Sequence, residues 1–280
     1  MSRTYQATGI NLKGMPLGEA DRMMTVLSPE YGFIRAVAPG ARKHKSKLRG
    51  RSELFIVNQL LIVKGRSLDK IIQAETIETY PGLSRDLGKL AASQYLAELV
   101  LCFEKGDIQS QELYELFKEH LRRIEKLLPC PTRPISTPIM AHLTQAIFHL
   151  LALAGIAPSV RVCCQTQKIL QADLADPNFR VGFSFCSGGA IGLPLQENFA
   201  TTAPKIDRRL TGLELSLLQQ LGEKYLPETE PKFSAGSLDR SWFKIEKLLR
   251  DYTQYHFERP IRSASLIDLG DLKSSKTIHT

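Results

Sequence analysis

The pattern of apolar and polar residues changes at Tyr80-Pro81-Gly82, and this change limits the folds that the chain can adopt. Before it, short apolar and alternating segments separated by turn residues cover 5–14, 21–40 and 54–78. About five short strands with glycine-bearing turns in some 80 residues are typical of a small closed or nearly closed barrel. We therefore expect an OB-like β-barrel over residues 1–80.

Beyond this point apolar residues recur at helical spacing, so the fold class is α+β. The spacing predicts helices over about 87–103 and 111–128, and Thr137 followed by Pro138 is a suitable N-cap and first turn for a third. Thr211 with Glu214 has capping-box spacing, and Ser237 precedes a long amphipathic segment. We expect a helical domain at 81–157 and 201–262, with an irregular insertion at 158–200 between its two parts. A C-terminal segment follows at 263–280, and we expect its end to be disordered.

The most strongly charged segment is RKHKSKLRGR at 42–51, where six of ten side chains are Lys or Arg and none is acidic. Residues 1–80 hold 13 basic and 7 acidic side chains, a balance of +6. The other 200 residues hold 24 and 22, a balance of +2. The basicity therefore belongs to the predicted barrel, and the segment predicts a loop or strand edge that faces a polyanion, of which nucleic acid is the commonest. A solvated loop without function is the alternative.

Motifs for catalysis, membrane insertion and secretion are missing from the sequence, so we expect a cytoplasmic protein that is not an enzyme. There is no Walker-type loop, no dinucleotide-binding glycine motif, no H-E-x-x-H and no nucleophile elbow. His142 and His149 lie seven residues apart on one predicted helix face, a spacing that could bring two ligands together, but without nearby acidic residues packed or surface histidines are favoured. The most apolar stretch, 147–157, is about half the length that a bilayer demands. The N-terminus lacks the apolar core of a signal peptide.

The insertion carries Cys163, Cys164 and Cys186. A structural zinc site usually has four ligands, often as two C-x-x-C pairs, and adjacent cysteines point apart. Five cysteines in a chain of this length do not indicate a disulfide framework. Buried or inert reduced thiols are therefore favoured over a zinc site.

A longer pattern of residues resembles the RecO family of bacterial recombination mediators. It begins with TGINLKGMPLGEADRMMTVLSPEYGFIRAVAPGARKHKSKLRGRSELF at 8–55. KGRSLDKIIQAE at 64–75 and LLRDYTQYHFERPIRSASLI at 248–267 follow in the order expected for that family. The similarity spans most of the chain.

This resemblance implies an N-terminal OB-fold, a helical bundle and a zinc-finger-like insertion. It also implies a protein that binds single- and double-stranded DNA, anneals complementary strands, and works with RecR and single-strand-binding protein to help load RecA in recombinational repair. In many family members the insertion has two C-x-x-C pairs. Aligning them puts Cys163, Thr166, Gly192 and Leu195 at the four ligand positions. Three expected ligands are missing, so we expect no cofactor and an insertion that keeps its shape by packing around the Gly188-Gly189 turn.

Annealing requires only a surface that neutralises two phosphate backbones, and Lys and Arg side chains on a barrel supply one. Tyr31 and Phe33 are possible base-stacking residues, although the position of Phe33 at the start of an alternating strand favours the core. In the turn 18–22, the acidic residues beside Arg22 predict a local ion pair, with a protein contact as the alternative. The candidate DNA-binding residues are Arg35, Arg42, Lys43, Lys45, Lys47, Arg49, Arg51, Lys64 and Arg66.

Two other functions remain open at this point: an OB-fold RNA-binding factor, and a helical scaffold whose basic patch is incidental. Neither explains the block at 8–55. If the protein captures the acidic tail of single-strand-binding protein, the helical domain must offer an apolar groove with a cationic rim, which the sequence does not place.

Overall fold

The computed structural model describes residues 4–129, 135–193, 204–226 and 235–268. The chain divides into two compact units, Met1–Pro129 and Cys130–Thr280. Over its described residues, 4–129, the first unit holds the barrel together with four helices, one of them in a barrel loop. The predicted domain boundary at residue 80, which follows the change in sequence pattern, lies inside this unit. Among the described residues, no helix is both long and apolar enough to cross a membrane.

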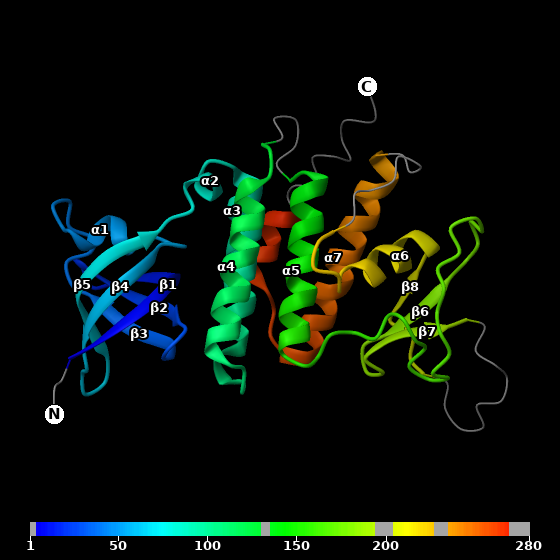
Figure 1. Ribbon diagram of the computed structural model, residues 1–280, viewed down its shortest axis with the longest axis horizontal. Helices are drawn as coiled ribbons and strands as arrows, with labels where there is room; N and C mark the ends of the chain where they lie inside the picture. Colours follow the sequence, from blue (N-terminus) through cyan, green and yellow to red (C-terminus); the bar gives the residue numbers. More distant parts are fainter. Residues whose placement is uncertain (1–3, 130–134, 194–203, 227–234, 269–280) are drawn as a thin grey trace. The chain divides into compact units, whose positions relative to one another are not determined.

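The predicted OB-like barrel is confirmed: five strands close in the order β1-β2-β3-β5-β4 (Figure 1). The long strand β1 pairs with two neighbours. Its first half pairs with β4 and its second half with β2, and a bulge near Asn11 lies between the two halves. A short parallel pairing of Ala36 with Asp69 joins β3 to β5 and completes the closure. The strands are β1 (Thr4–Leu17), β2 (Asp21–Ser28), β3 (Gly32–Ala38), β4 (Val57–Val63) and β5 (Asp69–Glu78).

Alternation along the strands fills the barrel. In β3, the side chains of Ile34, Ala36 and Ala38 belong to the core cluster, while Phe33 is only half-buried and Arg35 is exposed. The expectation that Phe33 belongs to the core is therefore wrong, because Phe33 lies on the face of β3 opposite to Ile34, Ala36 and Ala38. Gly32 has φ of +67°, a conformation that favours glycine and ends the tight turn from β2.

Three helices complete the first unit, α2 (Pro81–Ser84), α3 (Leu87–Cys102) and α4 (Ser110–Lys126), with a short 3-10 turn at Phe103–Lys105. The two longer helices confirm the periodicity read from the sequence. Lys89 of α3 is buried, and its ammonium donates to the carbonyls of Glu125 (2.8 Å) and Leu127 (2.5 Å). It thereby satisfies carbonyls at the end of α4 that have no partner within the helix.

Glu78, the last residue of β5, ties the barrel to α4. Its carboxylate accepts hydrogen bonds from Arg122 Nε (2.9 Å) and Nη2 (3.1 Å), and it lies 3.1 Å from Lys118 Nζ. Burial alone would raise the pKa of Glu78, but the bonds from Arg122 and Lys118 outweigh it and lower the pKa to about 2. The carboxylate therefore stays ionised at neutral pH and holds two cations of one helix.

The second unit packs α5 against α7 and carries a small antiparallel sheet in the order β7-β6-β8 (Figure 1). The capping box of Thr211 with Glu214 is confirmed at the start of α6. Two other predicted caps are wrong: Ser136 and not Thr137 is the N-cap of α5, and Ser237 lies inside α7. The elements are α5 (Thr137–Leu153), β6 (Val181–Ser184), β7 (Gly189–Gly192), β8 (Arg208–Leu210), α6 (Gly212–Gln220), α7 (Ala235–Phe257) and a 3-10 turn (Arg262–Ala264).

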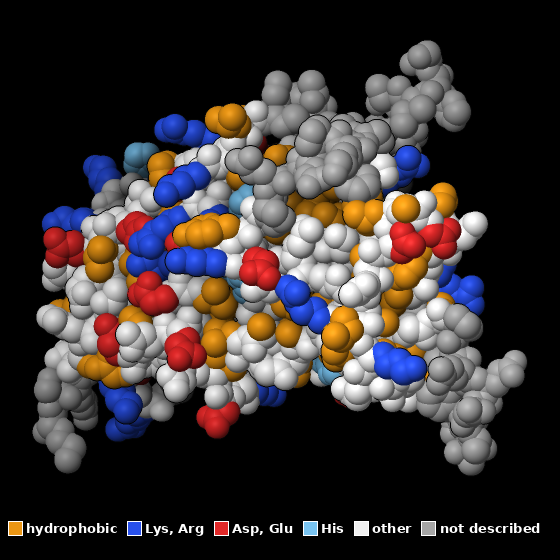
Figure 2. All heavy atoms as spheres, turned by 45° about the vertical axis from the view of Figure 1, so that its right-hand side comes forward, with side chains coloured by type: hydrophobic (Ala, Val, Ile, Leu, Met, Phe, Trp, Pro, Cys, Tyr) orange, Lys and Arg blue, Asp and Glu red, His pale blue; other side chains and the backbone are white. Residues whose placement is uncertain are grey.

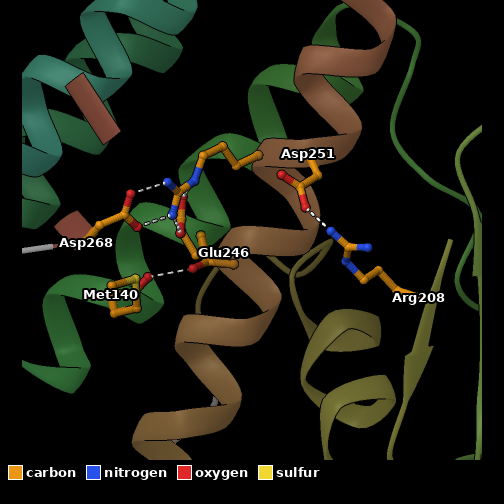
Figure 3. A network of polar contacts seen from close by, with 7 residues as sticks. Met140, Arg208, Glu246, Asp251 and Asp268 are labelled. Carbon is orange, nitrogen blue, oxygen red and sulfur yellow. Dashed lines mark hydrogen bonds and ion pairs between the residues drawn. The ribbon is translucent and has the colours of Figure 1, made fainter. Parts of the chain in front are cut away.

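Glu246 and Asp268 belong to a polar network in this unit (Figure 3), and Arg250 of α7 joins them. Its guanidinium donates to both oxygens of Glu246, one turn earlier, and to both oxygens of Asp268 near the C-terminus. The side chain of Glu246 is 1% exposed, whereas that of Asp268 is 57% exposed. The hydrogen bond from Arg250 lowers the pKa of Asp268. Residues up to Asp268 are thus tied to α7, and the predicted disordered end, 270–280, lies outside the described residues.

Candidate nucleic-acid interface

The basic segment 42–51, called the basic loop from here on, leaves the barrel after β3 and ends in a single helical turn, α1 (Leu48–Arg51). The sequence predicted a loop or strand edge without this turn. Asp21 Oδ1 accepts the amide of Gly40 at 2.7 Å, and the amide of Arg42 donates to the carbonyl of Ala20 at 2.9 Å. The start of the loop is therefore fixed to the β1–β2 turn.

Two buried asparagines hold the far end of the basic loop. Asn11 Nδ2 donates to the carbonyls of Arg51 (2.8 Å) and Glu53 (2.7 Å), and Asn58 Nδ2 donates to that of Arg51 at 2.9 Å. Both amides lie almost wholly out of solvent, at 2% and 0% exposure. Because buried polar groups stay paired, these bonds fix the path of the backbone that carries the cations.

Arg22 does pair with a carboxylate, but not with one in its own turn. Its guanidinium lies 2.9 Å from Glu53 Oε1 and 3.0 Å from the carbonyl of Ser52. The predicted local ion pair within 18–22 is wrong, because the carboxylate of Asp21 accepts a hydrogen bond from the amide of Gly40 instead. Arg22 instead helps to secure the end of the basic loop.

The predicted DNA-binding residues differ in exposure and in their partners within the fold. Arg42 is committed to the fold, since its Nη1 donates to the carbonyl of Gly18 at 2.8 Å. Arg35 pairs with Glu104 at 2.7 Å, although its side chain remains 60% exposed. Arg51 is only partly exposed. The others are exposed and have no carboxylate partner among the described residues: Lys43, Lys45, Lys47, Arg49, Lys64 and Arg66.

This arrangement concentrates uncompensated positive charge in the basic loop. On the face that Figure 2 shows, Lys and Arg side chains are interspersed with Asp and Glu side chains. The basic loop differs in having four exposed cations within seven residues, Lys43 to Arg49, and no acid among them. Such a cluster attracts phosphates without reading base sequence.

A second feature of the barrel is a pocket of about 440 Å³, called the aromatic pocket from here on. The rings of Tyr5 and Tyr31 meet there with centroids 5.0 Å apart at 54°. The hydroxyl of Tyr5 donates to Asp69 Oδ2 at 2.6 Å, and burial, with this bond, raises the pKa of Tyr5. The main lining side chains are Tyr5, Tyr31, Phe33, Arg35, Lys64 and Asp69.

Arg35 of β3, Phe33 of the same strand and Lys64, the residue after β4, all line the aromatic pocket although they are distant in sequence. Tyr5 and Asp69 were not predicted as site residues. Tyr5 reads as an ordinary strand aromatic, and no local pattern shows that it meets Tyr31, 26 residues away. Tyr31 and Phe33, the two aromatic residues that the sequence offered for base stacking, both line this pocket.

In the insertion, three of the four positions expected to hold zinc lie together, but their chemistry does not fit the metal. The buried Cys163 Sγ accepts the amides of Thr166 and Gly192, each at 3.4 Å. Burial alone would raise the pKa of the Cys163 thiol, but hydrogen bonds from Thr166 and from backbone amides lower it. Thr166 and Gly192 supply no sulfur, imidazole or carboxylate, and Leu195 lies outside the described residues. Among the described residues, no group of three His, Cys, Asp or Glu is placed to hold a metal.

Packing holds this insertion in the described part of the chain. Gly189 has φ of +156°, and a Cβ there would lie 2.1 Å from the carbonyl oxygen of Ser159, whose backbone it approaches. The ring of Phe183 meets that of Tyr252 of α7 edge to face, 5.8 Å between centroids. Val181, Ala190 and Leu215 form a small hydrophobic cluster, against which Leu170, Ala172 and Phe179 pack.

Comparisons with known proteins match the chain along nearly its whole length. Residues 1–80 match the family model described as "Recombination protein O N terminal", and residues 84–265 match "Recombination protein O C terminal". Similar proteins include one from Gloeothece citriformis, 58% identical over 96% of this chain and 98% of its own length. One from Trichodesmium erythraeum is 51% identical, over 96% and 95%, and one from a Nostoc species 50% identical, over 96% of each. All three carry the name "DNA repair protein RecO".

Proposed function

The chain belongs to the recombination protein O family of DNA repair proteins, and on this premise we propose that it binds single- and double-stranded DNA and anneals complementary strands. The observation that carries the proposal is the basic loop. Its exposed cations, Lys43, Lys45, Lys47 and Arg49, stand on a backbone that buried asparagines and Asp21 hold in place.

Annealing then requires no covalent step. Two DNA strands repel one another through their phosphates, and cations that sit between them release condensed counterions and reduce that repulsion. Contacts to phosphate leave the base edges free to pair. A protein that works in this way needs no nucleophile, general base or metal, so we propose that it is not an enzyme.

We further propose the partners that the family membership suggests: RecR, single-strand-binding protein and, indirectly, RecA. The protein would act in the cytoplasm, at the nucleoid, where DNA coated by single-strand-binding protein must be handed to RecA. Insertion in a membrane is not part of this proposal.

The test is the annealing of complementary oligonucleotides, bare or coated with single-strand-binding protein, followed by fluorescence energy transfer between labelled strands. The full chain should accelerate annealing of both. A variant with Lys43, Lys45, Lys47 and Arg49 all changed to Ala should lose most of the acceleration. A control variant with Lys105, Lys126, Lys168 and Lys247 changed to Ala loses the same charge from exposed positions elsewhere and should keep it. Equal annealing by the two variants would contradict the proposal.

Binding to structured RNA is the main rival, because a basic loop attracts any phosphate backbone. Competition between single-stranded DNA and a structured RNA of equal length separates the two. Preference for the RNA would favour an RNA-binding factor, and the absence of salt-sensitive binding to either would favour a helical scaffold.

A further inference from the structure

The aromatic pocket differs in chemistry from the basic loop. Its positive and negative groups nearly balance, because Arg35 is paired with Glu104, and Asp69 and Lys64 both line the cavity. Asp69 is held by the Tyr5 hydroxyl and by the amide of Gly65 at 3.1 Å. A pocket with this lining has little attraction for a phosphate group, and its aromatic walls suit a flat, uncharged ring.

The rings of the pocket are already arranged to receive such a ring. Tyr31 lies in the tight turn between β2 and β3 and is 55% exposed. Tyr5 cannot turn freely, because its hydroxyl is bound to Asp69. Since one tyrosine is fixed and supports the other, a stacked ligand would order few side-chain rotamers on binding.

The pocket is also joined to the basic loop by a single strand. Arg35 lines the pocket, and β3 runs from it to Ala38, with three residues between that end and the loop. The extended chain from Arg35 to Ala38 spans about 10 Å. This is about the length of three nucleotides at the 3.4 Å rise of one stacked strand. A strand with a base in the pocket therefore has phosphates within reach of the loop.

We propose that the aromatic pocket binds one unpaired base of single-stranded DNA by stacking it on Tyr31, while the basic loop holds neighbouring phosphates. This inference rests on the proposed function and adds to it a reason for strand preference. A base in a duplex is already stacked and paired, so it cannot enter the pocket without being extruded. The pocket thus strengthens binding to single strands and leaves binding to duplex DNA unaltered.

The test compares Tyr31→Ala with the unaltered full chain in fluorescence anisotropy titrations of a labelled oligonucleotide. Stacking of one base on an aromatic side chain predicts a loss of affinity for the single strand of about 5- to 150-fold. Tyr31→Phe keeps the ring and should bind as the unaltered chain does. Tyr225→Ala is the matched control, since Tyr225 is 64% exposed and lies in the second unit. Far-UV circular dichroism should show that each variant is folded.

Two further ligands separate the contribution of the base to binding from that of the phosphates. For a strand of the same length made of abasic sites, and for a duplex, Tyr31→Ala should bind as the unaltered chain does, with the same salt dependence. Equal affinity of Tyr31→Ala and the unaltered chain for the normal strand would overturn the inference, and so would an equal loss on all three ligands. Both outcomes would leave the proposed DNA binding standing. If the unaltered chain shows no salt-sensitive binding to any DNA, the proposed function fails and the inference fails with it.

Discussion

Changing Glu78 to Gln removes the carboxylate that ties β5 to α4, and the stability lost by this change should depend on pH. The unfolded chain leaves Glu78 near its ordinary pKa of 4.5, whereas the folded protein holds it at about 2. A folded-state pKa below the unfolded value means that the ionised carboxylate stabilises the fold. The stabilisation is present above about pH 4.5 and is lost as the pH falls through about 2.

The size of the effect follows from the two pKa values. A difference of about 2.5 at 1.36 kcal/mol for each pKa unit sets an upper limit of about 3.4 kcal/mol. Glu78 and Arg122 are 26% and 40% exposed, so solvent screens their attraction. We therefore expect Glu78→Gln to lower the free energy of unfolding by about 1–2 kcal/mol at pH 7.

The assay is urea unfolding followed by far-UV circular dichroism, for the unaltered chain and the variant, at several pH values from 7 down to 3. The difference between the two free energies of unfolding should shrink below about pH 4.5. Glu119→Gln is the control, because Glu119 is 44% exposed and pairs with Arg123 one turn later in the same helix, and we expect at most about 0.5 kcal/mol. A difference that stays constant with pH, or none at pH 7, would refute the reasoning.

Two other predictions concern the second unit. Arg250→Leu leaves the buried Glu246 without its guanidinium and should cost about 3–5 kcal/mol, whereas Asp268→Asn, at an exposed partner, should cost at most about 1 kcal/mol. Fluorescence of the single, buried Trp242 in urea measures both, and equal costs would contradict the stated role of burial. The purified chain should hold no stoichiometric zinc, and a chelator should leave Tm unchanged. About one zinc per chain that is lost in Cys163→Ser would overturn that expectation.

Much of the fold could be predicted because it is encoded locally. Alternation predicts the five strands, and apolar spacing predicts α3 and α4, since each pattern reports which side of an element meets the core. The capping box of Thr211 and Glu214 could be predicted for the same reason, because both partners lie within one helical turn. Cap positions one residue away, such as Ser136 in place of Thr137, are less certain, because adjacent Ser and Thr residues are both good caps.

The candidate site was predictable in its charge and not in its geometry. A run of Lys and Arg is visible in any sequence, but the partners that neutralise some of these cations are not local: Glu104 is 69 residues from Arg35. The asparagines that anchor the basic loop carry no charge and match no motif, so nothing in the sequence distinguishes Asn11 from an ordinary strand residue. The aromatic pocket likewise exists only after closure of the barrel brings β1, β3 and the β4–β5 turn together.

The salt dependence of binding to single-stranded DNA tests the central claim most directly. If Lys43, Lys45, Lys47 and Arg49 contact about four phosphates, changing them to Ala should flatten the slope of log affinity against log salt by about 3 to 4, at roughly 0.7–0.9 for each contact. The variant that lacks Lys105, Lys126, Lys168 and Lys247 should keep the slope of the unaltered chain. An unchanged slope in the loop variant, with the fold intact by circular dichroism, would show that the basic loop does not hold the DNA.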